Sequence, residues 1–239
     1  MSSILVRLIG FIHIARKRVI DKAVSLPETA RQMIRLIVLL LLLVFPLLPE
    51  GRAQMSREQA ITLEQLIVEG KLDEAEQAYL AVLEEHPGSL LALSNLGVVY
   101  YRKGEIFDAI RILSKAVRIA PKDGFSHRTL GMCYLKVDEL DLAITSLEEA
   151  IKLNPSDFMA HNFMGIVATK KGWWKTAETE CRRAIELNKD YMDAYFNLAV
   201  VYSSQEPPRK VLGARAYREA VALGAERSAE LEKKLGVEF

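Results

Sequence analysis

Cysteine is scarce in this chain: its 239 residues include two, Cys133 and Cys181. Neither forms part of a CxxC pair, so a disulfide framework and a zinc site of the usual spacing are excluded. A chain of this length buries a large hydrophobic core and needs no such crosslinks. We therefore expect both thiols to pack as small, buried hydrophobic side chains.

A large net charge is also missing. The chain has 32 Lys+Arg and 31 Asp+Glu, a net charge of +1, which gives no bulk attraction for nucleic acid or anionic lipid. We therefore expect no nucleic-acid partner. Residues 1–53 hold eight basic and three acidic residues, which leaves 24 basic and 28 acidic residues, a net charge of −4, for residues 54–239. A basic front segment thus precedes a mildly acidic body.

Catalytic motifs are absent from the sequence. It contains no HExxH, no GxxxxGK[ST], no GxSxG, and no GxGxxG after a strand. His127 and His161 are the obvious candidates for metal binding or acid–base chemistry, but no neighbouring Cys, Asp or Glu motif supplies further ligands. We interpret both as helix-packing histidines. The sequence predicts a protein that is not an enzyme, with no cofactor and no metal.

One long apolar run, Leu36–Leu48, stands out near the N-terminus. Arg31 and Arg35 precede it, and Gly51 and Ala53 follow at the small-residue positions that a signal peptidase reads. The run is short for a membrane span, which needs about 20 apolar residues. We predict a secretory signal within residues 1–53 that is cleaved after Ala53, so that the body is exported to the periplasm or secreted.

Two alternatives to cleavage stay open. The segment 36–48 could remain as a membrane anchor, with its basic side cytoplasmic and the body outside the cytoplasm, or it could be a helix buried on all sides. The basic segment before the apolar run is long for a signal peptide. A chain that starts at Met33 would have a signal of more usual length, so we also consider Met33 as the initiator.

The body of the chain repeats with a period of 34 residues. Pro87, Pro121 and Pro155 are spaced by this interval, as are the pairs Leu96-Gly97, Leu130-Gly131, Met164-Gly165 and Leu198-Ala199 and the alanines Ala75, Ala109, Ala143 and Ala177. Fixed-period self-similarity of this length is typical of stacked repeats. It resembles the tetratricopeptide repeat (TPR), whose 34-residue unit carries Leu-Gly, Tyr, Ala and Pro in this order.

The resemblance implies an all-α solenoid of antiparallel helix pairs in a right-handed superhelix. The predicted units are residues 56–89, 90–123, 124–157, 158–191 and 192–225, followed by a capping helix and tail over 226–239. In the second unit the apolar spacing predicts one helix that ends near Gly104 and a second helix that runs from Ile106 to Ile119. Ser89, Asp123 and Asp157 precede helices at positions where a side-chain oxygen caps free N–H groups.

Two units depart from the pattern. Leu63 and Leu66 occupy the Gly and Tyr positions of the first unit, so we expect looser packing there. In the fifth unit, Pro207 and Pro208 lie between the helices, and the turn is predicted to be two residues longer. Trp174 falls at a position where the family usually has an aromatic residue that packs within the unit. Trp173 has no such role, and we consider two alternatives for it equally: an exposed side chain, or one folded over the loop.

The resemblance also implies a binding surface. In the family, first helices line a concave groove, and five positions of each first helix point into it. Carried onto this sequence, the predicted partner-binding residues are Leu91, Val98, Tyr101, Arg102, Phe125, Arg128, Met132, Lys136, Met159, Asn162, Ile166, Lys170, Phe196 and Val200. An exposed apolar strip of this kind marks an interaction site, although some of these side chains could instead pack between units.

We therefore predict a scaffold that binds a protein or peptide partner in the groove of units two to five. The partner would supply apolar anchors and acidic residues that bind Arg102, Arg128, Lys136 and Lys170. The alternative is a membrane-anchored structural subunit of an envelope assembly that uses its outer face, including Trp173 and the turn at Pro207 and Pro208.

Overall fold

The computed structural model describes residues 57–238, with side chains from residue 61 onward. The chain divides into two compact units, Met1–Gln54 and Met55–Phe239, and the second contains all of the described residues. The predicted signal or anchor at 36–48, the cleavage after Ala53 and the start at Met33 lie outside the described residues. Within residues 57–238, no helix combines the length and hydrophobicity needed to cross a bilayer.

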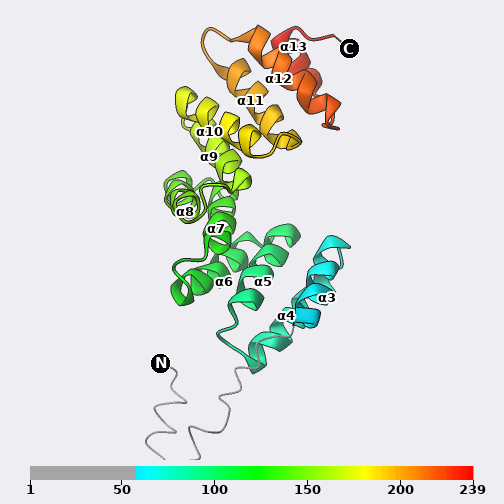
Figure 1. Cartoon of the computed structure of the whole chain (residues 1–239), viewed down its shortest axis with the longest axis vertical. Coiled ribbons are helices and arrows are strands. Elements are labelled where there is room, and N and C mark those ends of the chain that lie inside the picture. Colours follow the sequence, from blue (N-terminus) through cyan, green and yellow to red (C-terminus); the bar gives the residue numbers. More distant parts are fainter. Residues whose placement is uncertain (1–56, 239) are drawn as a thin grey trace, which may run out of the picture. The chain divides into compact units, whose positions relative to one another are not determined.

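The described residues form eleven helices and no strand (Figure 1). The prediction of an all-α, TPR-type solenoid is therefore confirmed. The helices are α3 (Arg57–Val68), α4 (Leu72–Glu85), α5 (Leu90–Lys103), α6 (Ile106–Ile119), α7 (Gly124–Lys136), α8 (Leu140–Leu153), α9 (Phe158–Lys170), α10 (Trp174–Leu187), α11 (Met192–Ser204), α12 (Lys210–Ala222) and α13 (Ala229–Leu235).

Local chemistry explains where the helices begin and end. The side chains of Ser89, Asp123 and Asp157 each accept a hydrogen bond from a first-turn backbone N–H, as their positions predict. Gly104 ends α5 in the left-handed conformation, with φ of 81°. The equivalent turn in the third unit places Asp138 at φ of 62°, a conformation that a side chain disfavours.

In the second, third and fourth pairs, a glycine on the first helix lets the second helix approach closely. A Cβ atom added at Gly131 would lie 2.7 Å from Cγ of Leu147, and one added at Gly165 would lie 2.6 Å from Sγ of Cys181. The repeated glycine therefore sets the separation of the two helices. Both cysteines are free and buried, which confirms the packing role predicted for them.

Neighbouring pairs stack mainly through the second helix of one pair and the first helix of the next, with smaller contacts between first helices. Helix α5 contacts α7, α7 contacts α9, and α9 contacts α11, while each second helix contacts the next first helix along the chain. The fifth pair accommodates its longer turn, because Tyr217 and Ala220 fill buried positions of α12. Helix α13 then covers the end of the stack with buried Leu231 and Leu235.

Candidate partner-binding surface

The first-helix surface comprises the fourteen predicted partner-binding residues of α5, α7, α9 and α11. Its members differ in exposure. Leu91, Arg102, Phe125, Lys136 and Lys170 are exposed; Val98, Tyr101, Arg128, Met132, Met159, Ile166, Phe196 and Val200 are half-buried; Asn162 is buried.

The exposed apolar side chains gather on two helices that touch. Leu91 on α5 is 39% exposed and Phe125 on α7 is 37% exposed, whereas the other large apolar side chains of these helices are buried or half-buried. Further along α5, Val98 and Tyr101 pack partly against the buried core of the first units. This half of the surface therefore keeps accessible apolar area next to a rigid support.

The apolar members on α11 are engaged within the fold. Phe196 and Val200 pack against the buried cluster of the C-terminal units, and the ring of Phe196 lies edge-on to Tyr217 with centroids 6.1 Å apart. These two side chains therefore serve packing between units as well as any surface role.

Two of the four basic members are neutralised by neighbouring units. Nη1 of Arg128 lies 2.6 Å from Oδ2 of Asp157, the N-cap of α9, and both side chains are mostly buried. The guanidinium also lies 5.1 Å from the ring centre of Phe125. Nζ of Lys170 lies 2.8 Å from Oδ1 of Asp138 in an exposed pair. Each ion pair joins adjacent units of the stack.

The other two basic members have no carboxylate partner among the described residues. Nη1 of Arg102 donates a hydrogen bond of 2.8 Å to the carbonyl oxygen of Ile67, which is uncharged. Lys136 is exposed, and its ammonium makes no hydrogen bond or ion pair within residues 61–238. Both positive charges are therefore available to a bound molecule.

Asn162 is part of a buried polar network rather than an open surface. Its side chain is 2% exposed. Its Oδ1 accepts a hydrogen bond of 2.9 Å from Asn197, and its Nδ2 donates one of 3.4 Å to the hydroxyl of Tyr191. Burial raises the pKa of Tyr191 to about 12, so the hydroxyl stays protonated. This network links α9 to the fifth unit, and burial keeps Asn162 out of reach of a partner.

The two histidines differ although they share a repeat position. Nδ1 of His161 lies 2.7 Å from Oε2 of Glu180 on α10, and its Nε2 lies 3.2 Å from the carbonyl oxygen of Pro155. His127 has the equivalent carbonyl contact, 3.1 Å to Pro121. Sequence reasoning missed Glu180, although a buried histidine needs such a partner. No group of three or more metal-ligating side chains occurs within the described part of the chain.

The turns and second helices also carry exposed apolar side chains, two of which sequence reasoning missed. Phe107 on α6 is 78% exposed and Val211 on α12 is 84% exposed. Phe107 replaces the aspartates found one period away at 73 and 141, and this break in a polar position was the available signal. Trp173 is 48% exposed, with Nζ of Lys171 5.1 Å from its ring centre.

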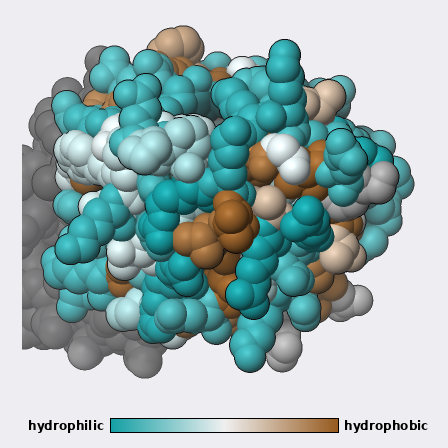
Figure 2. Space-filling view, turned by 90° about the horizontal axis from the view of Figure 1, so that it is seen from above, coloured by the Kyte–Doolittle hydropathy of each residue, from teal (hydrophilic) through white to brown (hydrophobic). Residues whose placement is uncertain are grey.

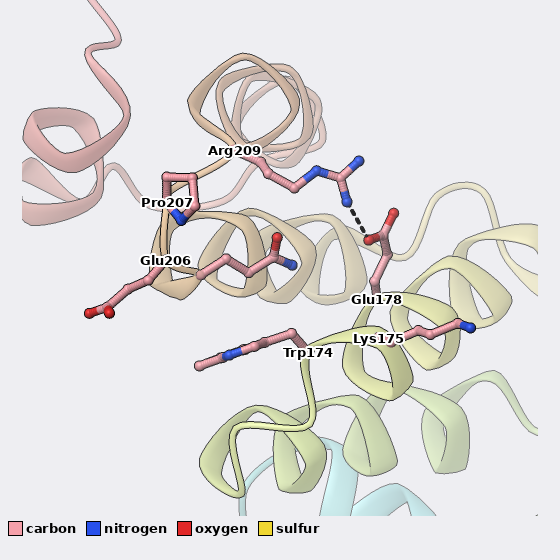
Figure 3. Close-up of a pocket in the computed structure, with 7 residues that line it drawn as sticks. Trp174, Lys175, Glu178, Glu206, Pro207 and Arg209 are labelled. Carbon is pink, nitrogen blue, oxygen red and sulfur yellow. Dashed lines mark hydrogen bonds and ion pairs between the residues drawn. The ribbon is translucent and has the colours of Figure 1, made fainter.

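A shallow cleft of about 530 Å³ lies between the turns of the fourth and fifth pairs (Figure 3). Trp174 forms one side, and Pro207 and Glu206 lie across from it. The ion pair between Arg209 and Glu178, 2.7 Å long, occupies the edge. The cleft is too open to enclose a small molecule.

Hydrophobic side chains do not merge into one large area on the face seen from above. Figure 2 shows small brown areas separated by hydrophilic side chains.

Comparisons with known proteins agree with this architecture. Two tetratricopeptide repeat family models match residues 66–124 and 129–157. No curated protein matches the sequence.

Several solved structures share the fold. A crystal structure of MamA is 25% identical, covers 67% of this chain and 93% of its own, and has a TM-score of 0.57. YrrB, described as a TPR protein with an unusual peptide-binding site, is 22% identical and covers 76% of this chain and 92% of its own, with a TM-score of 0.56. TTC0263 from Thermus thermophilus is 21% identical and covers 74% of this chain and 95% of its own, with a TM-score of 0.61. The chain described here therefore carries tetratricopeptide repeats, stacked as a TPR-type solenoid.

Proposed function

We propose that this protein is a non-catalytic scaffold that binds a segment of another protein on its first-helix surface. The observation that carries the proposal is the pair of exposed apolar side chains, Leu91 and Phe125, on adjacent helices that are otherwise well packed. Large apolar side chains that remain exposed beside a rigid core favour a binding role. TPR repeats are generally protein-interaction modules, and YrrB, with the same fold, has a peptide-binding site.

The proposal is tested by placing a photo-crosslinking amino acid at Phe125 in the native host. We expect a discrete crosslinked product whose yield falls when Leu91 is replaced by alanine, since removal of an anchor weakens binding by about 1–3 kcal/mol. The same crosslinker at Phe107, on the second helix of the neighbouring pair, is the matched control. Crosslinking at Phe107 but not at Phe125 would contradict binding on the first helices.

We further propose that the repeats are exported. The support is the sequence alone: the apolar run 36–48, the basic residues before it, and the small residues Gly51 and Ala53 after it. Mass spectrometry of the mature protein tests this, and we expect an N-terminus at Gln54. A full-length N-terminus in the membrane fraction would instead indicate an anchor.

A second candidate function is a membrane-anchored subunit of an envelope assembly that makes contacts through its turns and second helices. The observation that favours it is the high exposure of Phe107, Val211 and Trp173. Replacement of Phe107 and Val211 by serine should then disrupt the assembly and leave crosslinking at Phe125 unchanged. An assembly that persists in this double variant, with crosslinking at Phe125 retained, would favour the first proposal.

A further inference from the structure

We infer that the partner segment is acidic, and that its carboxylates bind Arg102 and Lys136 while an apolar residue packs on Leu91 and Phe125. This inference rests on the proposed binding role of the first-helix surface. It narrows that surface to the second and third units and assigns a chemistry to the segment that binds there.

The four residues form two rows across a pair of touching helices. Leu91 and Arg102 are eleven residues apart on α5, as are Phe125 and Lys136 on α7. Eleven residues at 100° each return to within about 20° of the same helix face, and the rise of 1.5 Å per residue separates the rows by about 16 Å. Leu91 and Phe125 form an apolar row at the N-terminal ends of the two helices, and Arg102 and Lys136 form a cationic row at their C-terminal ends. The two helices contact each other.

The charge of this region favours carboxylates. Along the stack, Arg128 and Lys170 are neutralised by Asp157 and Asp138. Arg102 binds only an uncharged carbonyl, and Lys136 binds nothing among residues 61–238. The two unneutralised charges of the predicted set therefore occur together, in the units where Leu91 and Phe125 are exposed.

The polar contacts between units support the same location. Side-chain hydrogen bonds and ion pairs tie the third unit to the fourth and the fourth to the fifth, through Asp157, Asp138 and Asn162. Among the described residues, no side-chain hydrogen bond joins α5 or α6 to α7 or α8. Arg102 and Lys136 therefore lie on the two units whose mutual contact, within residues 61–238, uses no side-chain hydrogen bond.

The distance between the rows sets the spacing within the partner. An extended chain advances about 3.3 Å per residue, so the apolar residue and the carboxylates lie about five residues apart. The probe is a fluorescent peptide with one Leu-Phe pair, a four-residue Gly-Ser spacer and one Glu-Glu pair, so that Phe and the first Glu are five residues apart. Two comparison peptides carry Gln-Gln or Lys-Lys in place of the carboxylates.

Fluorescence anisotropy with the purified full chain at low salt measures the preference. We expect the Glu-Glu peptide to bind about tenfold more tightly than the Lys-Lys peptide, with a difference that shrinks as salt is added. The double variant Arg102→Glu/Lys136→Glu should reverse the order. The control variant Lys175→Glu/Lys210→Glu makes the same change in net charge on second helices and should keep the wild-type order of affinities.

Equal binding of all three peptides, with loss of binding in Phe125→Ala, would overturn the acidic inference and leave the proposed function standing. Binding that is unaffected by Phe125→Ala would overturn both. If the loss of the bond between Arg102 and Ile67 unfolds the double variant, Lys136→Glu alone provides the test, because its ammonium makes no contact that the fold requires. A preference unchanged in Lys136→Glu would refute the role of the cationic row.

Discussion

Protonation of His161 is expected to stabilise the fold, because both ring nitrogens face oxygen acceptors. The Glu180 carboxylate lies 2.7 Å from Nδ1 and the Pro155 carbonyl lies 3.2 Å from Nε2. A neutral imidazole has one N–H and satisfies one of these acceptors, whereas the imidazolium satisfies both. The bonds join α9 to α10 and to the preceding linker, so loss of the proton should loosen the fourth unit.

The direction of the pH dependence follows from the pKa. Burial lowers the pKa of His161, and the charge of Arg183 adds to that effect, but the hydrogen bonds to Glu180 and Pro155 and the charge of Glu180 together raise it above its ordinary value. The stabilisation is therefore complete below the unfolded pKa of about 6.5 and is lost as the pH rises through the folded pKa. Each unit by which the folded pKa exceeds the unfolded pKa adds about 1.4 kcal/mol to the expected loss in free energy of unfolding.

Urea unfolding of the wild type at several values between about pH 5.5 and 9 measures this loss. NMR titration of the imidazole protons locates the folded pKa. In Glu180→Gln the pH-dependent loss should disappear, because the amide has no negative charge to favour the imidazolium. The matched control is His127→Gln, which removes the histidine at the same repeat position and should preserve the loss. The same pH dependence in wild type and Glu180→Gln would refute the reasoning.

Three further results are expected. Gly131→Ala places a Cβ 2.7 Å from Leu147 and should lower the free energy of unfolding by about 1–3 kcal/mol, while Gly88→Ala, with open space around it, should change little in the same urea titration. Arg128→Met leaves the buried Asp157 carboxylate without its cation and should lower the free energy of unfolding by about 3 kcal/mol, as measured by thermal or urea unfolding. Lys170→Met breaks an exposed ion pair and is the control; a smaller loss in Arg128→Met than in Lys170→Met would contradict the importance of burial. Burial raises the pKa of both cysteine thiols to about 12, so they should react with a thiol reagent at pH 8 only after unfolding, and rapid labelling of the native protein would be inconsistent with the packing.

The exposed part of the candidate surface was only partly predictable from the sequence. The repeat register placed Leu91 and Phe125 on the first helices, and both are exposed. It could not distinguish Asn162 from them, because the hydrogen-bond partners of Asn162 are Tyr191 and Asn197, which lie 29 and 35 residues further along the chain. Residues that the repeat register assigns to the same helix face therefore differ in their surroundings.

The sequence by itself determined the period, the helix pairs and their ends. These features depend on neighbours within a few residues, such as the hydroxyl of Ser89 capping α5, or on the apolar spacing of a single helix. Only the tertiary structure decided which charges are neutralised and which histidine binds a carboxylate. Arg128 finds Asp157 on the following unit, and His161 finds Glu180 on the opposite helix of its pair. Such contacts depend on how the helices pack, and no fixed spacing within one helix encodes them.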